Sequence, residues 1–493
     1  MLSVYKRYTL IFIIISTVLR IFLASSLEFG NDEVYYWLYA KYPAISHFDH
    51  PPMVGFFIQF FTFNLFFDNE LVIRLAAIIP ISIAMYIIFL IASTIKNDKV
   101  GFIAVLLCNL NIYALVISGT FILPDAPMIL FWLLGFYFFI QSITEDVITE
   151  SKTKLLLGFL FTALAIYSKY QAIYLLFGVV LYIVSFRIQW LKTRTFYLGF
   201  IFPLIAIGLI FYWNYTNDFI SYKFHGNRVS FFSGSFNSTA FLREILGQII
   251  YNNPYLFYLS VLFLLAIYKK KLTDPKLYFI LFCSLPLLLT TIYLSIYRNT
   301  LPHWSGIAYI TLIPGLALLI EKIPIKRLVF GFAFMLIMLI TALFSVDKGL
   351  FIPVDNFAKK ERLGKNDVTL DMFGWKQASD KISSNLIKKQ LTQLPIVSNN
   401  WYPAAHIDYY IARPNKMKVY GLGNLANIHK YYWINNKYRP LEKEVLYITD
   451  SRNYKNPSIF QSNGYQTSEL IQKTPILRNG VVVKYVFVYK LFK

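Results

Sequence analysis

Apolar stretches long enough to cross a membrane recur along the first 345 residues of this 493-residue chain. A helix needs about 20 consecutive apolar residues to cross the hydrocarbon core of a bilayer. Only 15% of the residues are charged and the mean hydropathy is +0.52, whereas soluble proteins carry about 25% charged residues. The chain is therefore predicted to be a polytopic α-helical membrane protein.

The direction of the first crossing follows from the N-terminal residues. The apolar run 8–27 is too long for the core of a signal peptide and lacks a cleavage site, so we expect a retained anchor. Lys6 and Arg7 precede it and place the N-terminus in the cytoplasm. The next apolar run, 54–67, is short and contains two polar amides, which predicts a re-entrant or interfacial helix rather than a span.

With that choice the chain has about eleven spans. Those after the first are predicted at 71–95, 100–118, 126–142, 155–168, 171–186, 195–213, 246–268, 277–297, 305–320 and 328–345. All the Lys- and Arg-rich loops then face the cytoplasm, as the positive-inside rule requires. The same loops account for much of the net charge of +21, so membrane lipids, and no nucleic acid, are the expected partners of the basic residues.

Polar residues return after about residue 345, which divides the chain into a membrane domain (1–345) and a C-terminal domain (346–493). The second domain combines helix-like stretches, such as 375–389, with several short β-like runs. These runs are 394–398, 418–420, 445–449 and 481–489. We expect a small α/β domain on the external face.

The first external loop, 31–53, places several ionisable residues beside apolar runs, and such residues at a membrane boundary are functional by default. It opens with Asp32 and Glu33, followed by an aromatic segment, 34–42, that is expected to form a helix lying flat on the interface. Asp32 has the chemistry of a base that takes a proton from an acceptor hydroxyl. The alternative is that the acids only cap this helix.

The same loop ends in the motif His47-Phe48-Asp49-His50-Pro51-Pro52. The prolines stop a helix from running through it and restrict the backbone of the residues before them. A histidine beside a carboxylate suits contact with a phosphate head group or a sugar hydroxyl. Two histidines and one acid in a short loop are a weak metal signature, so His47, Asp49 and His50 are expected to bind substrate, with a metal or structural role as alternatives.

Two later turns fall on the same predicted face. Asp125 lies between two prolines at the start of a span, where it is either a functional acid or a helix N-cap. Lys169 and its neighbour Tyr170 lie between two apolar runs. Lys169 either neutralises a phosphate or extends its amine toward water from an apolar surface.

A third turn, with the sequence RNTLPHW, adds Arg298, His303 and Trp304 as candidate substrate-binding residues. The planar guanidinium of an arginine can hold a phosphate through two hydrogen bonds. His225 and Arg228, in the loop 214–243, are weaker candidates.

The order of these motifs resembles that of a known family. DEVYYW, FDHPPM, LPDAPMILFW, SKYQA and LPHWSGIAY, with DMFGWKQASDKI and NNWYPAAHIDYYI in the tail, are similar to motifs of the GT-C glycosyltransferases. The greatest similarity is to the bacterial group related to protein O-mannosyltransferases and lipid A aminoarabinose transferases. The resemblance covers nearly the whole chain.

This resemblance implies transfer of a hexose or pentose from a polyprenyl (undecaprenyl) phosphate carrier to a lipid A, glycan or protein hydroxyl. The reaction would invert the anomeric carbon at the external, periplasmic face of the inner (plasma) membrane. Asp32 matches the proposed base, with Glu33 beside it, and Asp49 and Asp125 match two further acids of the family. His50 stands where aminoarabinose transferases carry a lysine. No cofactor is implied as obligatory, although some GT-C enzymes use a divalent cation.

Two other classes of protein remain open. A flippase would move a lipid-linked sugar without chemistry, but it would be expected to show paired halves with broken helices at matching positions, which the sequence does not suggest. A polymerase or ligase of surface polysaccharide would use the same type of donor with a glycan acceptor.

Overall fold

The computed structural model describes residues 3–144, 151–229, 235–350, 359–437 and 442–493. Its internal contacts divide the chain into two compact units. The membrane unit comprises Met1–Ala24 and Pro43–Leu336, and the sheet unit comprises Ser25–Tyr42 and Ile337–Lys493. The division falls between residues 336 and 337, within the helix Ile325–Lys348, rather than between 345 and 346, and a short N-terminal segment, Ser25–Tyr42, belongs with the C-terminal residues.

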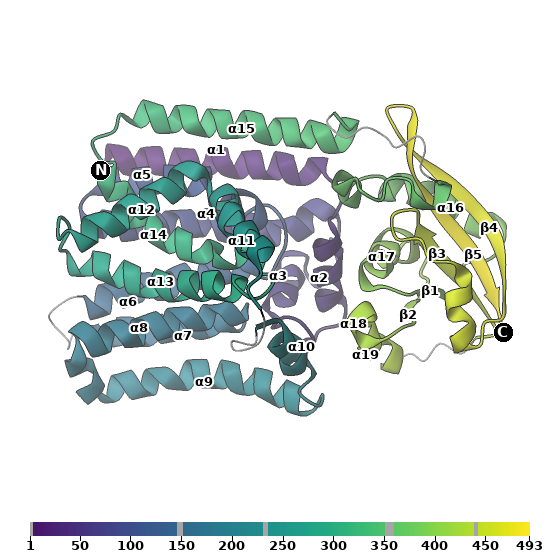
Figure 1. Ribbon diagram of the computed structural model, residues 1–493, viewed down its shortest axis with the longest axis horizontal. Coiled ribbons are helices and arrows are strands. Elements are labelled where there is room, and N and C mark those ends of the chain that lie inside the picture. The colour runs from purple at the N-terminus through teal and green to yellow at the C-terminus, as the bar shows by residue number, and fades with distance from the viewer. Residues whose placement is uncertain (1–2, 145–150, 230–234, 351–358, 438–441) are drawn as a thin grey trace. The chain divides into compact units, whose positions relative to one another are not determined.

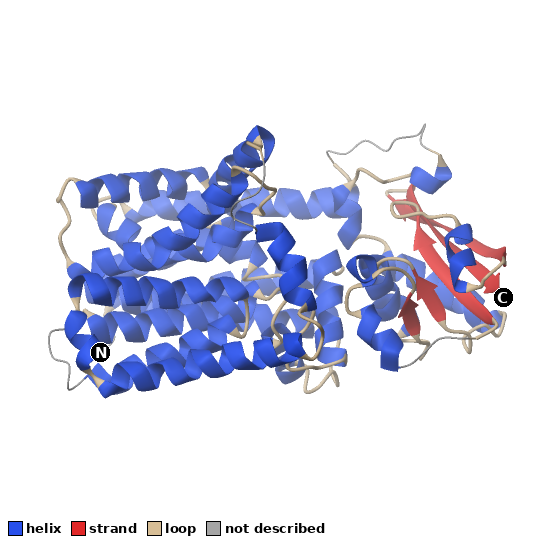
Figure 2. Ribbon diagram, turned by 60° about the horizontal axis from the view of Figure 1, so that its bottom comes forward, coloured by secondary structure: helices blue, strands red, loops and turns tan. Residues whose placement is uncertain are grey.

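The membrane unit is a bundle of helices (Figures 1 and 2). Its α-helices are α1 (Val4–Ser26), α3 (Met53–Phe61), α4 (Glu70–Ile95), α5 (Asp98–Leu110), α6 (Asp125–Ile143), α7 (Lys152–Ile166), α8 (Ile173–Phe186), α9 (Arg194–Tyr215), α10 (Ile220–Val229), α11 (Ser238–Asn252), α12 (Pro254–Tyr268), α13 (Pro275–Ser295), α14 (Gly306–Leu319) and α15 (Ile325–Lys348), the last of which continues into the sheet unit. Shorter turns are the π-helix η1 (Tyr113–Ile117) and the 3-10 helices η3 (Tyr170–Ala172), η4 (Ile188–Lys192) and η5 (Pro302–Ser305).

The prediction of a polytopic helical membrane protein is confirmed. Among the described residues, six helices are long and apolar enough to cross a membrane, namely α1, α4, α6, α9, α13 and α15. The bent pair α11 and α12 makes a seventh if it counts as one span. The sequence predicted about eleven, because it also counted apolar runs that fold into helices of 13 to 15 residues, such as α5 and α7.

One predicted span, 246–268, is wrong as a continuous helix. Helices α11 and α12 meet there at an angle of 103°. The break lies at Asn253, whose φ is +72°, and the following Pro254 has no backbone N–H with which to continue α11. The Asn253 side chain accepts a hydrogen bond from the backbone N–H of Tyr255 and so caps the new helix.

The run 54–67 forms a short helix, as predicted. Helix α3 has nine residues, too few to cross a bilayer. It is followed by a turn, and Phe60, Phe63 and Phe66 are 74–78% exposed. Aromatic side chains exposed in this way are typical of a segment at the membrane interface.

The sheet unit contains one five-stranded mixed sheet of strand order β2-β1-β3-β5-β4. Its strands are β1 (Ile396–Ser398), β2 (Val419–Gly421), β3 (Glu444–Asp450), β4 (Thr467–Arg478) and β5 (Val481–Phe492). β1 is parallel to both β2 and β3, whereas β5 is antiparallel to β3 and β4. Each of the four predicted β-like runs overlaps a strand. β4 was not predicted, although Asn479 and Gly480, both at positive φ, form the turn typical of a β-hairpin.

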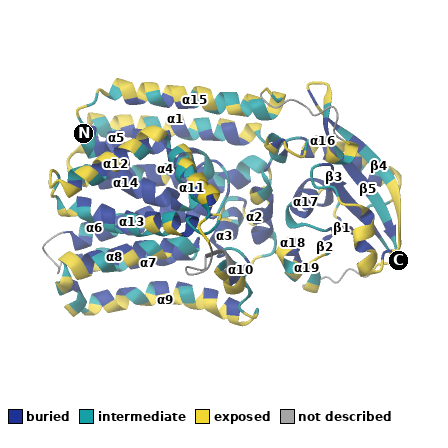
Figure 3. Cartoon of the chain, viewed as in Figure 1, coloured by how far each residue is buried: buried dark blue, intermediate teal, exposed yellow. Residues whose placement is uncertain are grey.

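The sheet unit also contains helices. They are α2 (Asn31–Lys41), α16 (Trp375–Lys388), α17 (Trp401–His406), α18 (Leu425–Ile428) and α19 (Tyr431–Lys437), with the π-helix η8 (Ile407–Ala412) and the 3-10 turns η6 (Lys360–Arg362), η7 (Val368–Met372) and η9 (Pro457–Asn463). Of these helices, α16, α17 and α19 pack against the sheet, and α2 packs against α17. The predicted helix 375–389 is confirmed as α16. The expectation that residues 34–42 lie flat on a membrane surface is wrong, because residues 33–40 of α2 are buried (Figure 3).

Candidate functional site

Two residues singled out from distant parts of the sequence form a buried ion pair in the membrane unit. Asp125 and Lys169 are 2% and 4% exposed. The Lys169 amine donates to both carboxylate oxygens of Asp125, at 2.8 and 2.7 Å, and the Tyr113 hydroxyl donates to the same carboxylate at 2.7 Å. Lys169 therefore does not extend toward water, and Asp125 lies in the first turn of α6 without capping it.

This pair is costly to bury. Removing two charges from water costs several kcal/mol per ion unless their attraction and further hydrogen bonds compensate. Here the carboxylate accepts three hydrogen bonds, two of them charge-assisted, which explains how the pair is accommodated. A buried ion pair is only weak evidence for a stabilising role, so its occurrence in this turn favours a part in function.

The loop that carries Asp49 and His50 is held by helix α10. His225 donates from Nε2 to the backbone oxygen of Asp49 at 2.9 Å. One turn earlier in α10, the Ser221 hydroxyl donates to the backbone oxygen of His47 at 3.4 Å. His47 is 1% exposed, while Asp49 and His50 are half-buried. These contacts bring His225, a weaker candidate from the sequence, into the site. The side chain of Arg228, on the same helix, lies outside the described part of the chain.

Aromatic rings connect this loop to the turn after α7. The ring of His225 lies 6.4 Å from that of His50 and 5.5 Å from that of Tyr170, centroid to centroid. Tyr170 is the direct neighbour of Lys169. The motif 47–52 and the 169–170 turn are therefore parts of one site.

Electrostatic interactions join the same residues. Burial lowers the pKa of His50 to about 4, although the negative charge of Asp49 acts in the opposite direction; Lys169 and His225 lower it further. Burial also lowers the pKa of His303 to about 4, with Lys169 lowering it and Asp125 raising it. Both imidazoles are therefore neutral at pH 7. The membrane unit thus gathers acids, histidines and one lysine from five separate parts of its sequence.

Arg298 and Trp304 belong to the same turn as His303. Arg298 is half-buried just after α13, and Trp304 is half-buried within η5. Their predicted contact with substrate stays a prediction.

A buried carboxylate that the sequence reading missed supports this turn. Glu244 in α11 is 1% exposed and accepts hydrogen bonds from the Thr300 hydroxyl at 2.6 Å and the Gln248 side chain at 2.8 Å. Gln248 in turn accepts from the Tyr309 hydroxyl at 2.8 Å. The signal was the spacing of Glu244 and Gln248, which places two polar side chains four residues apart on one face of an otherwise apolar helix. Tyr113, the partner of Asp125, gave no comparable signal because it lies within an apolar run.

The first pair of acids, Asp32 and Glu33, lies at the start of α2 in the sheet unit, and the two residues differ in exposure. Glu33 is 2% exposed, and its carboxylate accepts a hydrogen bond from the backbone N–H of Gly30 at 3.0 Å, so it caps the start of α2. Asp32 is the one exposed residue of α2. Capping thus falls to Glu33, and Asp32 presents its carboxylate at the surface of the unit.

No group of three or more His, Cys, Asp or Glu side chains is arranged to hold a metal ion within the described ranges. The site described above brings together the Lys169 ammonium, the Asp125 carboxylate and the imidazoles of His50 and His303.

The predicted fold class, a polytopic helical membrane bundle with a C-terminal α/β domain, is confirmed by solved structures of similar fold. Residues 49–213 match the model of the family described as dolichyl-phosphate-mannose-protein mannosyltransferase. The matched segment contains Asp49, His50, Asp125 and Lys169. No curated protein sequence matches the chain significantly.

Solved structures show the same fold over nearly the whole chain. ArnT from Cupriavidus metallidurans bound to undecaprenyl phosphate superposes with a TM-score of 0.64 and 11% identity, covering 98% of both chains. Its apo form gives 0.63 and 11% over 99% of this chain and 98% of that chain. The apo oligosaccharyltransferase of Archaeoglobus fulgidus gives 0.51 and 11% over 90% of this chain and 70% of that chain.

Proposed function

We propose that the chain is a membrane glycosyltransferase that moves a sugar from a polyprenyl-phosphate carrier to an acceptor hydroxyl. One observation carries the proposal. The buried Asp125–Lys169 pair, electrostatically coupled to His50, lies in the segment that matches a mannosyltransferase family. The fold of the whole chain is that of ArnT, which has been crystallised with undecaprenyl phosphate. That carrier is the donor lipid we propose here.

The cationic and neutral donors of the membrane unit suit a phosphate ester. Lys169 supplies a positive charge that is already balanced by Asp125. A phosphate that approaches His50 and His303 raises the pKa of both imidazoles, because a nearby negative charge favours the protonated form. Arg298 is the expected further contact. The site thereby gains positive charge as the anion arrives, without keeping unbalanced cations when it is empty.

In the transfer step the acceptor hydroxyl attacks the anomeric carbon on the face opposite the phosphate. The new carbon–oxygen bond forms as the bond to the phosphate oxygen breaks, and the polyprenyl phosphate leaves with the bonding electrons. Asp32 accepts the proton of the hydroxyl as general base. Basic groups stabilise the charge that develops on the leaving phosphate. The product has the inverted configuration, and no nucleotide or obligatory metal takes part.

The reaction takes place at the external face of the plasma membrane, which is the periplasmic face of the inner membrane in a Gram-negative cell. The positive-inside pattern supports this orientation. The acceptor is a hydroxyl of lipid A, another glycan or a protein, and the sugar is a hexose or a pentose.

The test is transfer by the purified protein in detergent. Undecaprenyl phosphate carrying a radiolabelled sugar is offered with a panel of lipid A, glycan and protein acceptors, to wild type and to Asp32→Asn. We expect label on one acceptor with wild type and not with the variant. Equal transfer by both would remove Asp32 from the role of base and leave Asp49 and Asp125 to be tested. Absence of transfer, with movement of the carrier lipid across liposomes that survives Asp32→Asn, would show a flippase instead.

A further inference from the structure

The segment that carries Asp32 is built into the sheet unit. Ser25–Tyr42 lies between the first membrane helix and the rest of the membrane unit in the sequence, yet its contacts assign it to the C-terminal residues. An isolated helix of the 11 residues of α2 would be marginally stable in water. The conformation of α2 therefore depends on what packs against it.

The N-terminal end of this segment is fixed by three hydrogen bonds. The Glu28 carboxylate accepts from the backbone N–H groups of Trp375 and Lys376, at 2.6 and 3.2 Å, and so caps the first turn of α16. The backbone N–H of Phe29 donates to the Tyr410 hydroxyl at 2.8 Å.

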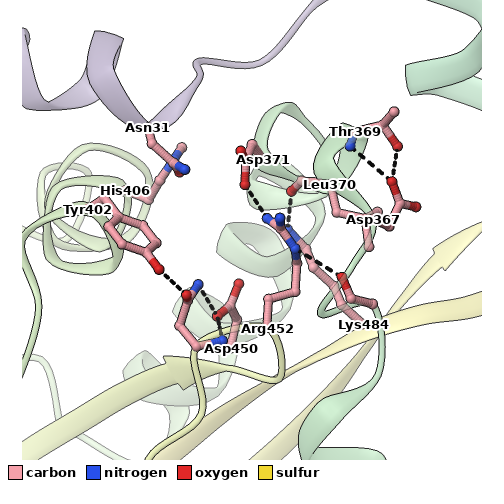
Figure 4. A network of polar contacts seen from close by, with 12 residues as sticks. Asn31, Asp367, Thr369, Leu370, Asp371, Tyr402, His406, Asp450, Arg452 and Lys484 are labelled. Atoms are coloured by element: carbon pink, nitrogen blue, oxygen red, sulfur yellow. Dashed lines mark hydrogen bonds and ion pairs between the residues drawn. The ribbon is translucent and has the colours of Figure 1, made fainter. Parts of the chain in front are cut away.

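His406 fixes the first residue of α2 itself. Its Nε2 lies 3.0 Å from Oδ1 of Asn31, next to Asp32 in the chain, and Figure 4 shows the two side chains together. His406 is fully buried and stacks on the ring of Trp375, with the centroids 4.4 Å apart and the planes inclined by 5°. Burial lowers the pKa of His406 well below its usual value. The imidazole is therefore neutral and held in one orientation, so Asn31 has a rigid partner.

The C-terminal end of α2 is fixed by an ion pair. The Lys41 amine lies 2.8 Å from Oδ1 of Asp408, whose other oxygen accepts from the Tyr431 hydroxyl at 3.4 Å. Asp408 is 2% exposed. Between the two ends, the ring of Tyr409 contacts those of Phe29 and Trp37, with centroids 4.9 and 5.2 Å apart.

Five of these contacts are made by four residues of one short stretch, 406–410. His406 ends α17, while Asp408, Tyr409 and Tyr410 belong to the π-helix η8. A π-helical turn is rare and is found frequently at functional sites. We call residues 406–410 with the first turn of α16 the clasp. The clasp contacts the segment on both sides of Asp32, and Asp32 itself is exposed.

We propose that the clasp positions the base of the transfer reaction, so that His406 and Asp408 are positioning residues of the active site. This inference rests on the proposed function, in which Asp32 is that base. A base works only within hydrogen-bond reach of its proton, and a misplacement of about 1 Å costs about 100-fold in rate. The C-terminal domain is then part of the catalytic apparatus and not a separable acceptor-binding module.

The test compares two ion pairs of the sheet unit whose carboxylates are buried. Asp408→Asn weakens the pair with Lys41, whereas Asp367→Asn weakens the pair of Asp367 with Arg478, whose atoms lie 2.6 Å apart. Asp367 is 7% exposed and none of its described contacts involves α2. Both variants should lose thermal stability. We expect Asp408→Asn to lower kcat by about 100-fold with KM for the carrier lipid within about twofold, and Asp367→Asn to leave kcat near wild type.

A second pair of variants tests the other end of α2. His406→Gln keeps a donor for Asn31 and is expected to retain more kcat than His406→Ala. Hydrogen exchange of residues 31–41 in the full-length protein should rise in Asp408→Asn and His406→Ala and not in Asp367→Asn. If Asp408→Asn and Asp367→Asn show the same kcat, the inference is wrong. If Asp32 is not the base, Asp32→Asn remains active although the clasp is intact. That outcome is distinct from failure of the inference about the clasp.

Discussion

The two units treat their charged residues in opposite ways. In the membrane unit, Asp125 and Lys169 neutralise each other and are both less than 5% exposed. In the sheet unit, α2 is enclosed by aromatic rings and hydrogen bonds, whereas Asp32 at its start is exposed.

This difference separates a group suited to binding an anion from a group suited to accepting a proton. A buried, paired lysine with neutral histidines around it is suited to hold an anion whose charge must be balanced only when it is bound. An exposed carboxylate on a fixed helix is suited to take up a proton. In the membrane unit the surroundings determine the charge of the histidines, while in the sheet unit the packing of α2 determines the position of Asp32.

The largest expected effect tests the role of the exposed carboxylate in the sheet unit. Asp32→Asn should lower the transfer rate by about 1,000-fold, because a positioned general base contributes about 10²–10⁴-fold. Glu33→Gln, its matched control, weakens the cap of α2 and should cost about 1 kcal/mol of stability while most of the activity remains. Initial rates with saturating donor and thermal denaturation measure both. Greater loss of activity in Glu33→Gln than in Asp32→Asn would reverse the two assignments.

The next largest effect tests the buried ion pair of the membrane unit. Lys169→Met leaves the Asp125 carboxylate buried without its cation, which should destabilise the membrane unit by about 3–5 kcal/mol. The control is Lys96→Met, because Lys96 pairs with Glu321 at an exposed position and such pairs contribute about 0–1 kcal/mol. Thermal denaturation in detergent compares the two variants.

A double variant then separates stability from binding. Asp125→Leu with Lys169→Met removes both charges and should recover much of the stability lost in Lys169→Met, since apolar replacements of buried ion pairs are often neutral. Its KM for the carrier lipid should remain raised. A double variant with the wild-type KM would show that the pair has no part in donor binding.

The histidines give a smaller effect that depends on pH. Burial depresses the pKa of His50 and of His303 to about 4, so the unfolded chain binds more protons than the folded chain between about pH 6.5 and 4. Stability from these residues is therefore complete above about pH 6.5 and is lost as the pH falls toward 4, by up to about 1.4 kcal/mol per pH unit for each histidine.

His50→Gln and His303→Gln should each flatten the decline of the denaturation temperature between pH 6.5 and 4.5. Adding undecaprenyl phosphate to wild type should flatten it too, because the phosphate favours the protonated imidazoles. A pH profile unchanged by either substitution would mean that both histidines titrate near their usual value.

The sequence predicted the class of fold and the composition of the membrane site more completely than its arrangement. Asp125 and Lys169 were both identified from polar residues between apolar runs, yet the spacing of 44 residues said nothing of an ion pair. That contact depends on how α6 and α7 pack, which single-sequence periodicity does not encode. Tyr113, which donates to Asp125, was missed because a tyrosine within an apolar run is usually a core residue.

The sheet unit shows a different limit. Residues 418–420 and 445–449 were recognised as strands because they are short and apolar. The assignment of Ser25–Tyr42 to this unit could not be predicted, since it joins positions more than 300 residues apart, such as Asn31 and His406. The tail motif that contains His406 was recognised only by resemblance, and its contacts with α2 are what the structure adds.

The smallest expected effect concerns divalent cations. Chelation with EDTA should leave the transfer rate within about twofold of the untreated enzyme, because Lys169 and the protonatable imidazoles supply the positive charge that a metal ion would otherwise supply to the leaving phosphate. Added Mg²⁺ or Mn²⁺ should likewise change little, and an enzyme stripped of metal before reconstitution is the control. A rate that falls with EDTA and returns with one cation would contradict the proposal that Lys169 and the imidazoles supply this positive charge. The membrane unit would then rely on a metal ion, with Asp49 the first ligand to test by Asp49→Asn.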